Sequence, residues 1–188
     1  MESVLSKITQ DACRTLQALA GEEGTFQKIA AAAIACLRSG GKILACGNGG
    51  SAADAMHLTQ ELVGHFRGDR RSLPGVSLTA DPTALTCIGN DFGFENVFSR
   101  QVEGLANPND LLVCFSTSGN SPNILRALEA AKAKGVKTVS LLGKGGGKAK
   151  GKADWEIIIA NSDSGRVQEA HTLILHALLE VIEREFSA

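Results

Sequence analysis

Two loops combine glycine with hydroxyl side chains in a way that can bind a phosphate group. The first loop, residues 47–51 (Gly-Asn-Gly-Gly-Ser), directly follows an apolar run and precedes a helical pattern. The serine loop, residues 116–122, carries four hydroxyls within six residues, on Ser116, Thr117, Ser118 and Ser121. Hydroxyls beside the free N–H groups of a helix start can surround a phosphate without a fixed positive charge. Either loop could instead be an ordinary turn that caps its own helix.

A nucleotide is a poor candidate for the first loop. In the GxGxxG pattern of dinucleotide-binding proteins the third glycine would fall on Ala52, and the lysine of a P-loop is missing. A phosphate or a sugar oxygen is therefore the better ligand.

Four further side chains have the types and spacing of a metal or acid–base site. His57 and Glu61 are four residues apart, so on a helix they share one face, and both suit zinc. Two ligands do not complete a tetrahedral site. Gln168 and His176, eight residues apart on another predicted helix, lie about 80° apart around its axis and can converge on one pocket. His171 is the rival of His176, and spacing alone does not choose between them.

Three other segments invite a functional interpretation. Asn90 and Asp91 stand between two glycines after the second predicted strand, where they can hydrogen-bond sugar hydroxyls or form an ordinary turn. Residues 144–152 carry four lysines among four glycines, and we interpret them as a flexible, solvated loop rather than an anion site. Arg67, Arg70 and Arg71 can steer phosphate toward the pocket, although exposed arginines need no function.

The composition is that of an ordinary globular protein. The 188 residues are 44% hydrophobic, and 19 basic against 20 acidic side chains give a net charge of −1, which argues against disorder and against a nucleic-acid-binding tail. The longest strongly apolar run, residues 29–37, is too short to cross a membrane, and the first residues do not resemble a secretory signal. We therefore expect a cytoplasmic protein whose five cysteines are buried thiols.

The hydrophobic pattern predicts an α/β fold. Two amphipathic helices, residues 4–19 and 26–37, precede a series of short apolar runs that alternate with helical stretches. The predicted strands are residues 42–46, 76–79, 111–115, 138–142 and 156–159. The predicted helices are residues 52–66, part of 96–105, 122–134 and 166–186. This alternation indicates one doubly wound parallel domain over residues 1–188, with residues 1–40 as an N-terminal helical extension that covers one sheet face and contacts another subunit.

The loops and the helix motifs together resemble a known family. Ser-Thr-Ser-Gly-Asn-Ser before a helix is similar to the signature of sugar isomerase (SIS) domains, which bind phosphosugars on a five-stranded parallel sheet. Residues 47–57, 89–93 and 168–171, taken with it, resemble the phosphoheptose isomerases over nearly the whole chain. The resemblance implies a homotetramer with active sites between subunits and a phosphosugar substrate.

This resemblance also implies roles for individual residues. Zn²⁺ would be held by His57, Glu61, Gln168 and His176, with Glu61 as the base that shuttles the carbon-bound proton and His176 as acid/base for the oxygens. The implied substrate contacts are Asn48, Gly49, Gly50, Ser51, Glu61, Asn90, Asp91, Ser116, Thr117, Ser118, Ser121 and Gln168. Gly165 stands where some members carry an aspartate, whose contact is then missing or comes from Asp163.

The implied reaction converts sedoheptulose 7-phosphate to D-glycero-D-manno-heptose 7-phosphate, the first step toward ADP-heptose and the heptose of the lipopolysaccharide core. Two alternatives share the fold: a non-catalytic adaptor of the replication initiator, and an isomerase of another phosphosugar. The presence of Glu61 and His176 favours an enzyme, because a binding module needs no acid–base pair.

Overall fold

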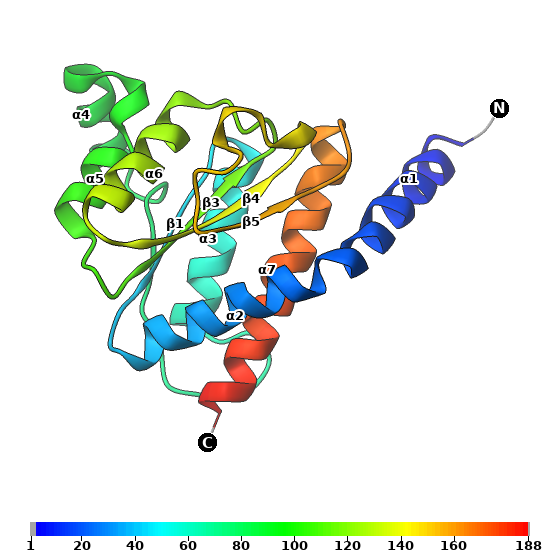
Figure 1. The fold of residues 1–188 in the computed structure, drawn as a ribbon, viewed down its shortest axis with the longest axis horizontal. Coiled ribbons are helices and arrows are strands. Elements are labelled where there is room, and N and C mark those ends of the chain that lie inside the picture. The colour runs from blue at the N-terminus through cyan, green and yellow to red at the C-terminus, as the bar shows by residue number, and fades with distance from the viewer. Residues whose placement is uncertain (1–2, 188) are drawn as a thin grey trace.

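A five-stranded sheet, parallel throughout, forms the centre of the protein (Figure 1). The computed structural model describes residues 3–187. Along the sheet the strand order is β2-β1-β3-β4-β5. The strands are β1 (Ile43–Cys46), β2 (Gly75–Ser77), β3 (Leu111–Ser116), β4 (Lys137–Leu142) and β5 (Trp155–Ile158). The predicted doubly wound α/β class is confirmed, with each strand within two residues of its predicted bounds.

Helices cover both faces of the sheet. On one face lie α2 (Glu23–Arg38), α3 (Gly50–Val63) and α7 (Ser164–Phe186), and on the other lie α5 (Ser99–Leu105) and α6 (Pro122–Ala133) (Figure 1). Successive strand residues point to opposite faces, so Val113 enters the first core while Leu112 and Cys114 enter the second. Burial on both sides explains why the strands are continuous apolar runs.

The N-terminal helices have different environments. α2 buries Ile29, Ala30, Ala33, Cys36 and Leu37 and belongs to the helix layer over the sheet. α1 (Val4–Ala18), joined to α2 by the short 3₁₀ helix η1 (Leu19–Glu22), buries only Thr15 and projects from the body as an arm (Figure 1). The sheet-covering role predicted for this extension therefore belongs to α2.

One helix was not predicted. α4 (Pro82–Phe92) occupies a segment whose end, residues 89–93, was interpreted as a loop. Asp81 caps it by accepting from the N–H groups of Thr83 and Ala84 at 2.9 and 3.0 Å, Pro82 fills its first turn, and Gly93 ends it at a φ of +86°. α4 buries none of its residues fully, but Leu85 and Ile88 pack, partly buried, against the second core. It packs mainly against η2 (Phe94–Asn96).

The cysteine prediction was only partly right. Cys36, Cys46 and Cys114 are buried thiols, but Cys13 and Cys87 are exposed. The two exposed cysteines lie on α1 and α4, the helices that bury one residue and no residue, respectively. The sequence therefore did not distinguish the exposed cysteines from the buried ones.

The C-terminal helix α7 is the longest, with 23 residues. Asp163 caps it by accepting from the N–H of Gly165 at 2.7 Å, so this carboxylate is used by the fold. One side of α7 enters the core, while Gln168, Thr172 and His176 follow one another along a side that meets α3. Among residues 3–187, no helix is both long enough and apolar enough to cross a membrane.

Candidate active site

The first loop joins β1 to α3 and lies against α7. Gly49, at a φ of +59° and a ψ of −123°, forms the N-cap of α3 in a conformation that favours glycine. The Ser51 N–H donates to the Asn48 carbonyl at 3.1 Å and closes the turn. A Cβ on Gly50 would lie 2.3 Å from Nε2 of Gln168, so this glycine lets the Gln168 amide approach the loop.

The serine loop uses some of its hydroxyls internally. Ser116 Oγ accepts from the N–H of Gly119 at 3.0 Å, and Ser118 Oγ accepts from the N–H of Asn120 at 3.2 Å. Ser121 stands at the N-cap position of α6, but its hydroxyl makes no capping hydrogen bond. The ordinary explanation of Ser121 as a helix cap is therefore excluded.

A pair of amides connects the two loops. Asn48 Nδ2 donates to Asn123 Oδ1, and Asn123 Nδ2 donates to Asn48 Oδ1, both at 2.9 Å. Asn123 is 2% exposed, so the pair fixes the first turn of α6 to the end of β1. The predicted substrate ligand Asn48 thus has a structural partner that sequence reasoning missed, because no spacing motif relates residues 75 positions apart.

Three other predicted residues meet on the seam between α3 and α7. We call His57, Glu61 and His176 the histidine–glutamate group. His57 Nε2 lies 3.4 Å from Glu61 Oε1, and the rings of His57 and His176 meet edge to face with centroids 4.9 Å apart. The Phe66 ring also stacks on the His176 ring, with centroids 5.3 Å apart. Burial lowers the pKa of His176, and the positive charge of His57 when protonated lowers it further.

The structure separates His176 from its rival. His171 is fully buried, with its ring 5.9 Å from that of Phe115, and neither ring nitrogen has a hydrogen-bond partner among the described residues. Burial lowers the pKa of His171 to about 4, and the nearby Leu142 carbonyl, which lies outside hydrogen-bond geometry, opposes this shift only weakly. His171 is therefore a neutral core residue, and His176 is the histidine that meets His57.

Gln168 does not join the histidine–glutamate group within one chain. α3 and α7 run side by side in the same direction, with Gln168 beside Gly50 and His176 two turns further on beside His57. Eight residues correspond to about 12 Å along the axis. The angle of about 80° around the helix axis predicted that Gln168 and His176 converge. Within one chain they do not, because the angle takes no account of their separation along the axis.

Asp54 lies between these two levels of the seam and was not predicted. Its Oδ1 accepts from Thr172 Oγ1 at 3.0 Å, while the buried Oδ2 has no partner among the described residues. Burial raises the pKa of Asp54, and the hydrogen bond from Thr172 partly opposes this shift. Sequence reasoning missed Asp54 because its burial depends on the packing of α3 against α7, which no local pattern reveals.

Asn90 and Asp91 lie apart from both loops. They form the last turn of α4, where Asn90 Nδ2 donates to Asp91 Oδ1 at 2.7 Å, and both are exposed. α4 stands at the periphery of the body, on the side of α5 and α6 (Figure 1). Within one chain they are therefore not part of the seam between α3 and α7.

The three arginines do not act as one cluster. Arg70 is buried, and its Nε lies 3.6 Å from Glu183 Oε1. Glu183 also accepts from the backbone N–H groups of Phe66, Arg67 and Gly68 at 2.9–3.0 Å, and although burial favours the neutral acid, these bonds lower its pKa. This contact holds the segment that carries Phe66, whose ring stacks on His176. Arg70 is therefore a structural residue rather than a free phosphate-steering cation.

The donors of the histidine–glutamate group are of the types that zinc binds, namely two imidazoles and a carboxylate. Their positions are not those of a finished site, since residues 3–187 contain no ready cluster of three His, Cys, Asp or Glu side chains around a metal position. The side chains of His57 and Glu61 are 34% and 16% exposed, so both are accessible from solvent. The donor chemistry thus fits zinc, and completing the site requires rearrangement.

The fold and the two loops define a sugar isomerase domain, and comparison with known proteins agrees. The family model described as SIS domain matches residues 9–143. A phosphoheptose isomerase 1 of Campylobacter jejuni is 45% identical over 186 residues, covering 99% of this chain and all of the relative. A phosphoheptose isomerase of Nitratiruptor is 54% identical over 153 residues, covering 81% and 82% of the two chains.

Solved structures show the same relationship. A phosphoheptose isomerase from Neisseria gonorrhoeae superposes with a TM-score of 0.89 at 38% identity and covers 96% of this chain and 97% of its own. Identity at this level over nearly the full length of both chains goes beyond a shared fold. The chain belongs to the phosphoheptose isomerase family of SIS-domain proteins.

Proposed function

We propose that this protein interconverts sedoheptulose 7-phosphate and D-glycero-D-manno-heptose 7-phosphate, the first step toward ADP-heptose and lipopolysaccharide core heptose. The observation that carries the proposal is the histidine–glutamate group, which places a carboxylate and two imidazoles together on the α3–α7 seam. Its setting in a chain 45% identical to a phosphoheptose isomerase over 99% of its length supports this reading.

Isomerisation requires a proton to leave the carbon beside the carbonyl and to return on the neighbouring carbon. Glu61 is the proposed base for both transfers, because its carboxylate is partly open to solvent and lies beside His57. His176 is the proposed acid/base for the sugar oxygens. The serine loop and the first loop are proposed to hold the phosphate and the nearby hydroxyls, since their backbone N–H groups and hydroxyls sit at helix starts.

Zn²⁺ is the proposed cofactor. His57, Glu61 and His176 would hold it, and Gln168 would reach it only after its amide leaves Gly50 or when the amide comes from another chain. When bound, the ion supplies Lewis-acid polarisation of the sugar oxygens. Proton transfer remains the task of Glu61 and His176.

A homotetramer with active sites between subunits is the proposed assembly. On the α1 arm, Val4 and Leu5 are 76% and 73% exposed, and Ile8 is 40% exposed, although these are apolar residues on a helix outside the core. In this fold such an arm gains contacts when a second copy packs against it. The separation of Gln168, Asn90 and Asp91 from the histidine–glutamate group also supports a site completed by another chain.

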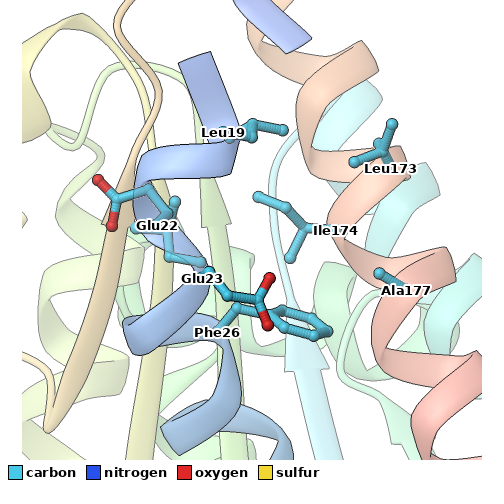
Figure 2. A pocket seen from close by; sticks show the side chains of 8 residues that line it. Leu19, Glu22, Glu23, Phe26, Leu173, Ile174 and Ala177 are labelled. Carbon is cyan, nitrogen blue, oxygen red and sulfur yellow. The ribbon is translucent and has the colours of Figure 1, made fainter. Parts of the chain in front are cut away.

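An apolar cavity next to the arm adds a second surface for this assembly. It has a volume of about 120 Å³, and Figure 2 shows Leu173, Ile174 and Ala177 of α7 facing Leu19 and Phe26 across it. Leu173 is 43% exposed at its edge. These residues lie on a different side of α7 from Gln168 and His176, so the cavity is not the proposed active site.

Complementation tests the shared site directly. Glu61→Gln and Asp91→Ala oligomers are each expected to be weakly active alone, and subunit mixing is expected to restore activity if the two residues serve one site from different chains. No gain on mixing, with exchange of subunits verified by native mass spectrometry, would assign both residues to the same chain. Light scattering that gives a monomer at micromolar concentration would contradict the tetramer itself.

A coupled assay tests the reaction. Purified, zinc-loaded protein is given sedoheptulose 7-phosphate, fructose 6-phosphate or arabinose 5-phosphate at equal concentration. Preferential conversion of the seven-carbon sugar is expected. Preference for a shorter phosphosugar would assign another substrate, and binding without conversion of any of them would indicate a non-catalytic adaptor. The cytoplasmic location predicted from the sequence stays a prediction.

A further inference from the structure

The glycine–lysine loop, which we define as residues 143–152, is largely exposed to solvent, as its composition predicts, but its backbone is also held against the serine loop. It contains the 3₁₀ helix η3 (Lys144–Ala149) and is hydrogen-bonded to the serine loop at both of its ends. The Gly143 N–H donates to the Ser116 carbonyl at 3.2 Å, and the Ala149 N–H donates to the Gly119 carbonyl at 2.9 Å. The serine loop is therefore packed against ordered backbone.

The two loops also fit closely in shape. A Cβ on Gly119 would lie 1.8 Å from the Gly146 carbonyl oxygen, and a Cβ on Gly147 would lie 2.3 Å from the Ser118 carbonyl oxygen. Gly119 and Gly147 have φ values of +62° and +53°, which other residues rarely adopt. Glycine on each side thus permits a backbone contact that any side chain would break.

A side chain of the serine loop completes the contact. Asn120 Oδ1 accepts from the backbone N–H of Lys148 at 3.0 Å. Asn120 is itself exposed, and so are the side chains of Lys144, Lys148 and Lys150. The glycine–lysine loop therefore contacts the serine loop through its backbone, and the lysine side chains point away from the interior.

The start of the glycine–lysine loop is strained. Lys144, at a φ of +50°, is the one non-glycine residue with a positive φ among residues 3–187. Such a conformation costs of the order of 1 kcal/mol or more and persists where the surrounding structure enforces it. The hydrogen bond from Gly143 to Ser116 lies directly before Lys144 in the chain. The strained residue therefore stands where the end of β4 is bonded to the end of β3.

We propose that the glycine–lysine loop is a positioning element of the phosphosugar site, which holds the serine loop in the conformation that binds phosphate. Asn120 and the backbone N–H of Lys148 are the positioning groups. The inference rests on the proposed function of the serine loop as the phosphate site. It predicts that breaking this contact weakens phosphosugar binding although every hydroxyl of the serine loop remains.

Lys148 offers a matched pair of variants. Lys148→Ala removes the charge and keeps the N–H, whereas Lys148→Pro removes both, and the helical backbone at this position suits proline. Lys148→Pro is expected to raise the KM for sedoheptulose 7-phosphate and the inhibition constant for inorganic phosphate about three- to tenfold, as for one lost hydrogen bond, with kcat within twofold. Lys148→Ala is expected to change either constant less than twofold. Asn120→Ala removes the acceptor and is expected to match Lys148→Pro.

The double variant Asn120→Ala/Lys148→Pro separates positioning from direct contact. If both residues act through their shared hydrogen bond, the double variant is expected to bind phosphate as tightly as the single variant with the lower affinity. Additive losses would mean that Asn120 touches the ligand itself and would overturn the proposal. If Lys148→Pro does not fold, the test is the comparison of Asn120→Ala with the parent in phosphosugar binding and in melting temperature.

Several results would overturn the proposal. Parent-like constants in Asn120→Ala and Lys148→Pro would do so, as would a lower melting temperature with unchanged constants, which is a purely structural role. Equal losses in Lys148→Ala and Lys148→Pro would assign the effect to charge. A parent protein that binds sedoheptulose 7-phosphate without converting it would refute the proposed isomerase activity only. The positioning proposal would still be tested, because the binding constants of the variants could be compared. A parent that binds neither phosphosugar nor phosphate would overturn both.

Discussion

The loop region and the histidine–glutamate group are built in different ways. Around the phosphate loops, backbone hydrogen bonds, left-handed glycines and the Asn48–Asn123 amide pair fix the chain at the carboxyl ends of β1, β3 and β4. Around His57, Glu61 and His176, partly exposed side chains meet on a helix seam without a complete set of ligands.

This difference assigns different tasks to the two regions. A site that holds a remote phosphate gains affinity when its donors are already in place. A group that must move protons between two carbons needs a carboxylate that substrate can reach, and the Glu61 side chain is 16% exposed on the seam. We therefore expect substitutions in the loop region to act mainly on KM and substitutions in the histidine–glutamate group to act mainly on kcat.

The largest expected effect is that of Glu61→Gln on turnover. Glutamine keeps the shape of the side chain but cannot accept the carbon-bound proton, so kcat is expected to fall about 10²- to 10⁴-fold with little change in phosphosugar affinity. Glu103→Gln, at an exposed glutamate on α5, is the matched control. A Glu61→Gln variant that loses affinity while keeping kcat would reverse the proposed division of tasks.

Metal removal is expected to act on the same group. Protein stripped of metal and verified by mass spectrometry is expected to lose at least about 100-fold in kcat, and Zn²⁺ is expected to restore it. His176→Asn should lower the zinc content, whereas His65→Asn, at an exposed histidine outside the group, should leave it unchanged. Full activity of the metal-free protein would exclude a metal role.

His171 is expected to make stability depend on pH. Its pKa is about 4 in the folded protein, against an ordinary value of 6.5. Between these values the unfolded chain binds a proton that the folded protein does not. The contribution of His171 to the free energy of unfolding is therefore highest above pH 6.5 and decreases as the pH falls toward 4. The loss attributable to His171 is up to about 3 kcal/mol.

Urea unfolding of the parent and of His171→Phe between pH 7 and pH 4 measures this contribution. The free energy of unfolding of His171→Phe is expected to fall less steeply with decreasing pH. The corresponding His65→Phe variant controls for removing an imidazole elsewhere. Parallel pH profiles for the parent and His171→Phe would mean that His171 is not a buried neutral group.

The smallest expected effects separate two serines of one loop. Ser121→Ala is expected to raise KM about 10- to 100-fold, as for a lost hydrogen bond to a charged phosphate, with an unchanged melting temperature because its hydroxyl does not cap α6. Ser116→Ala removes the acceptor of the Gly119 N–H and is expected to lower stability by about 1–3 kcal/mol as well. Equal melting temperatures for the two variants would contradict this distinction.

Local patterns predicted what depends on neighbours along the chain. The strand-to-helix turns and the His57–Glu61 spacing follow from apolar periodicity and helix geometry, and the structure confirms both. α4 escaped prediction because it ends in Gly89, Asn90 and Asp91, residue types that are typical of turns.

Contacts between distant segments could not be predicted in this way. The choice between His171 and His176 depends on which side of α7 faces the core. The Asn48–Asn123 pair and the contact between the serine loop and the glycine–lysine loop join residues that are remote in sequence. In the glycine–lysine loop, composition indicated flexibility because glycine serves both mobile loops and tight backbone packing.

Exchange of the carbon-bound hydrogen tests the central claim most directly. Zinc-loaded parent protein and Glu61→Gln are incubated with sedoheptulose 7-phosphate in deuterium oxide, and deuterium at the carbon beside the carbonyl is followed by mass spectrometry. The account predicts incorporation by the parent and none above background by Glu61→Gln, with phosphosugar binding retained in both. Incorporation by Glu61→Gln at the parent rate would mean that another residue is the base and would contradict the account.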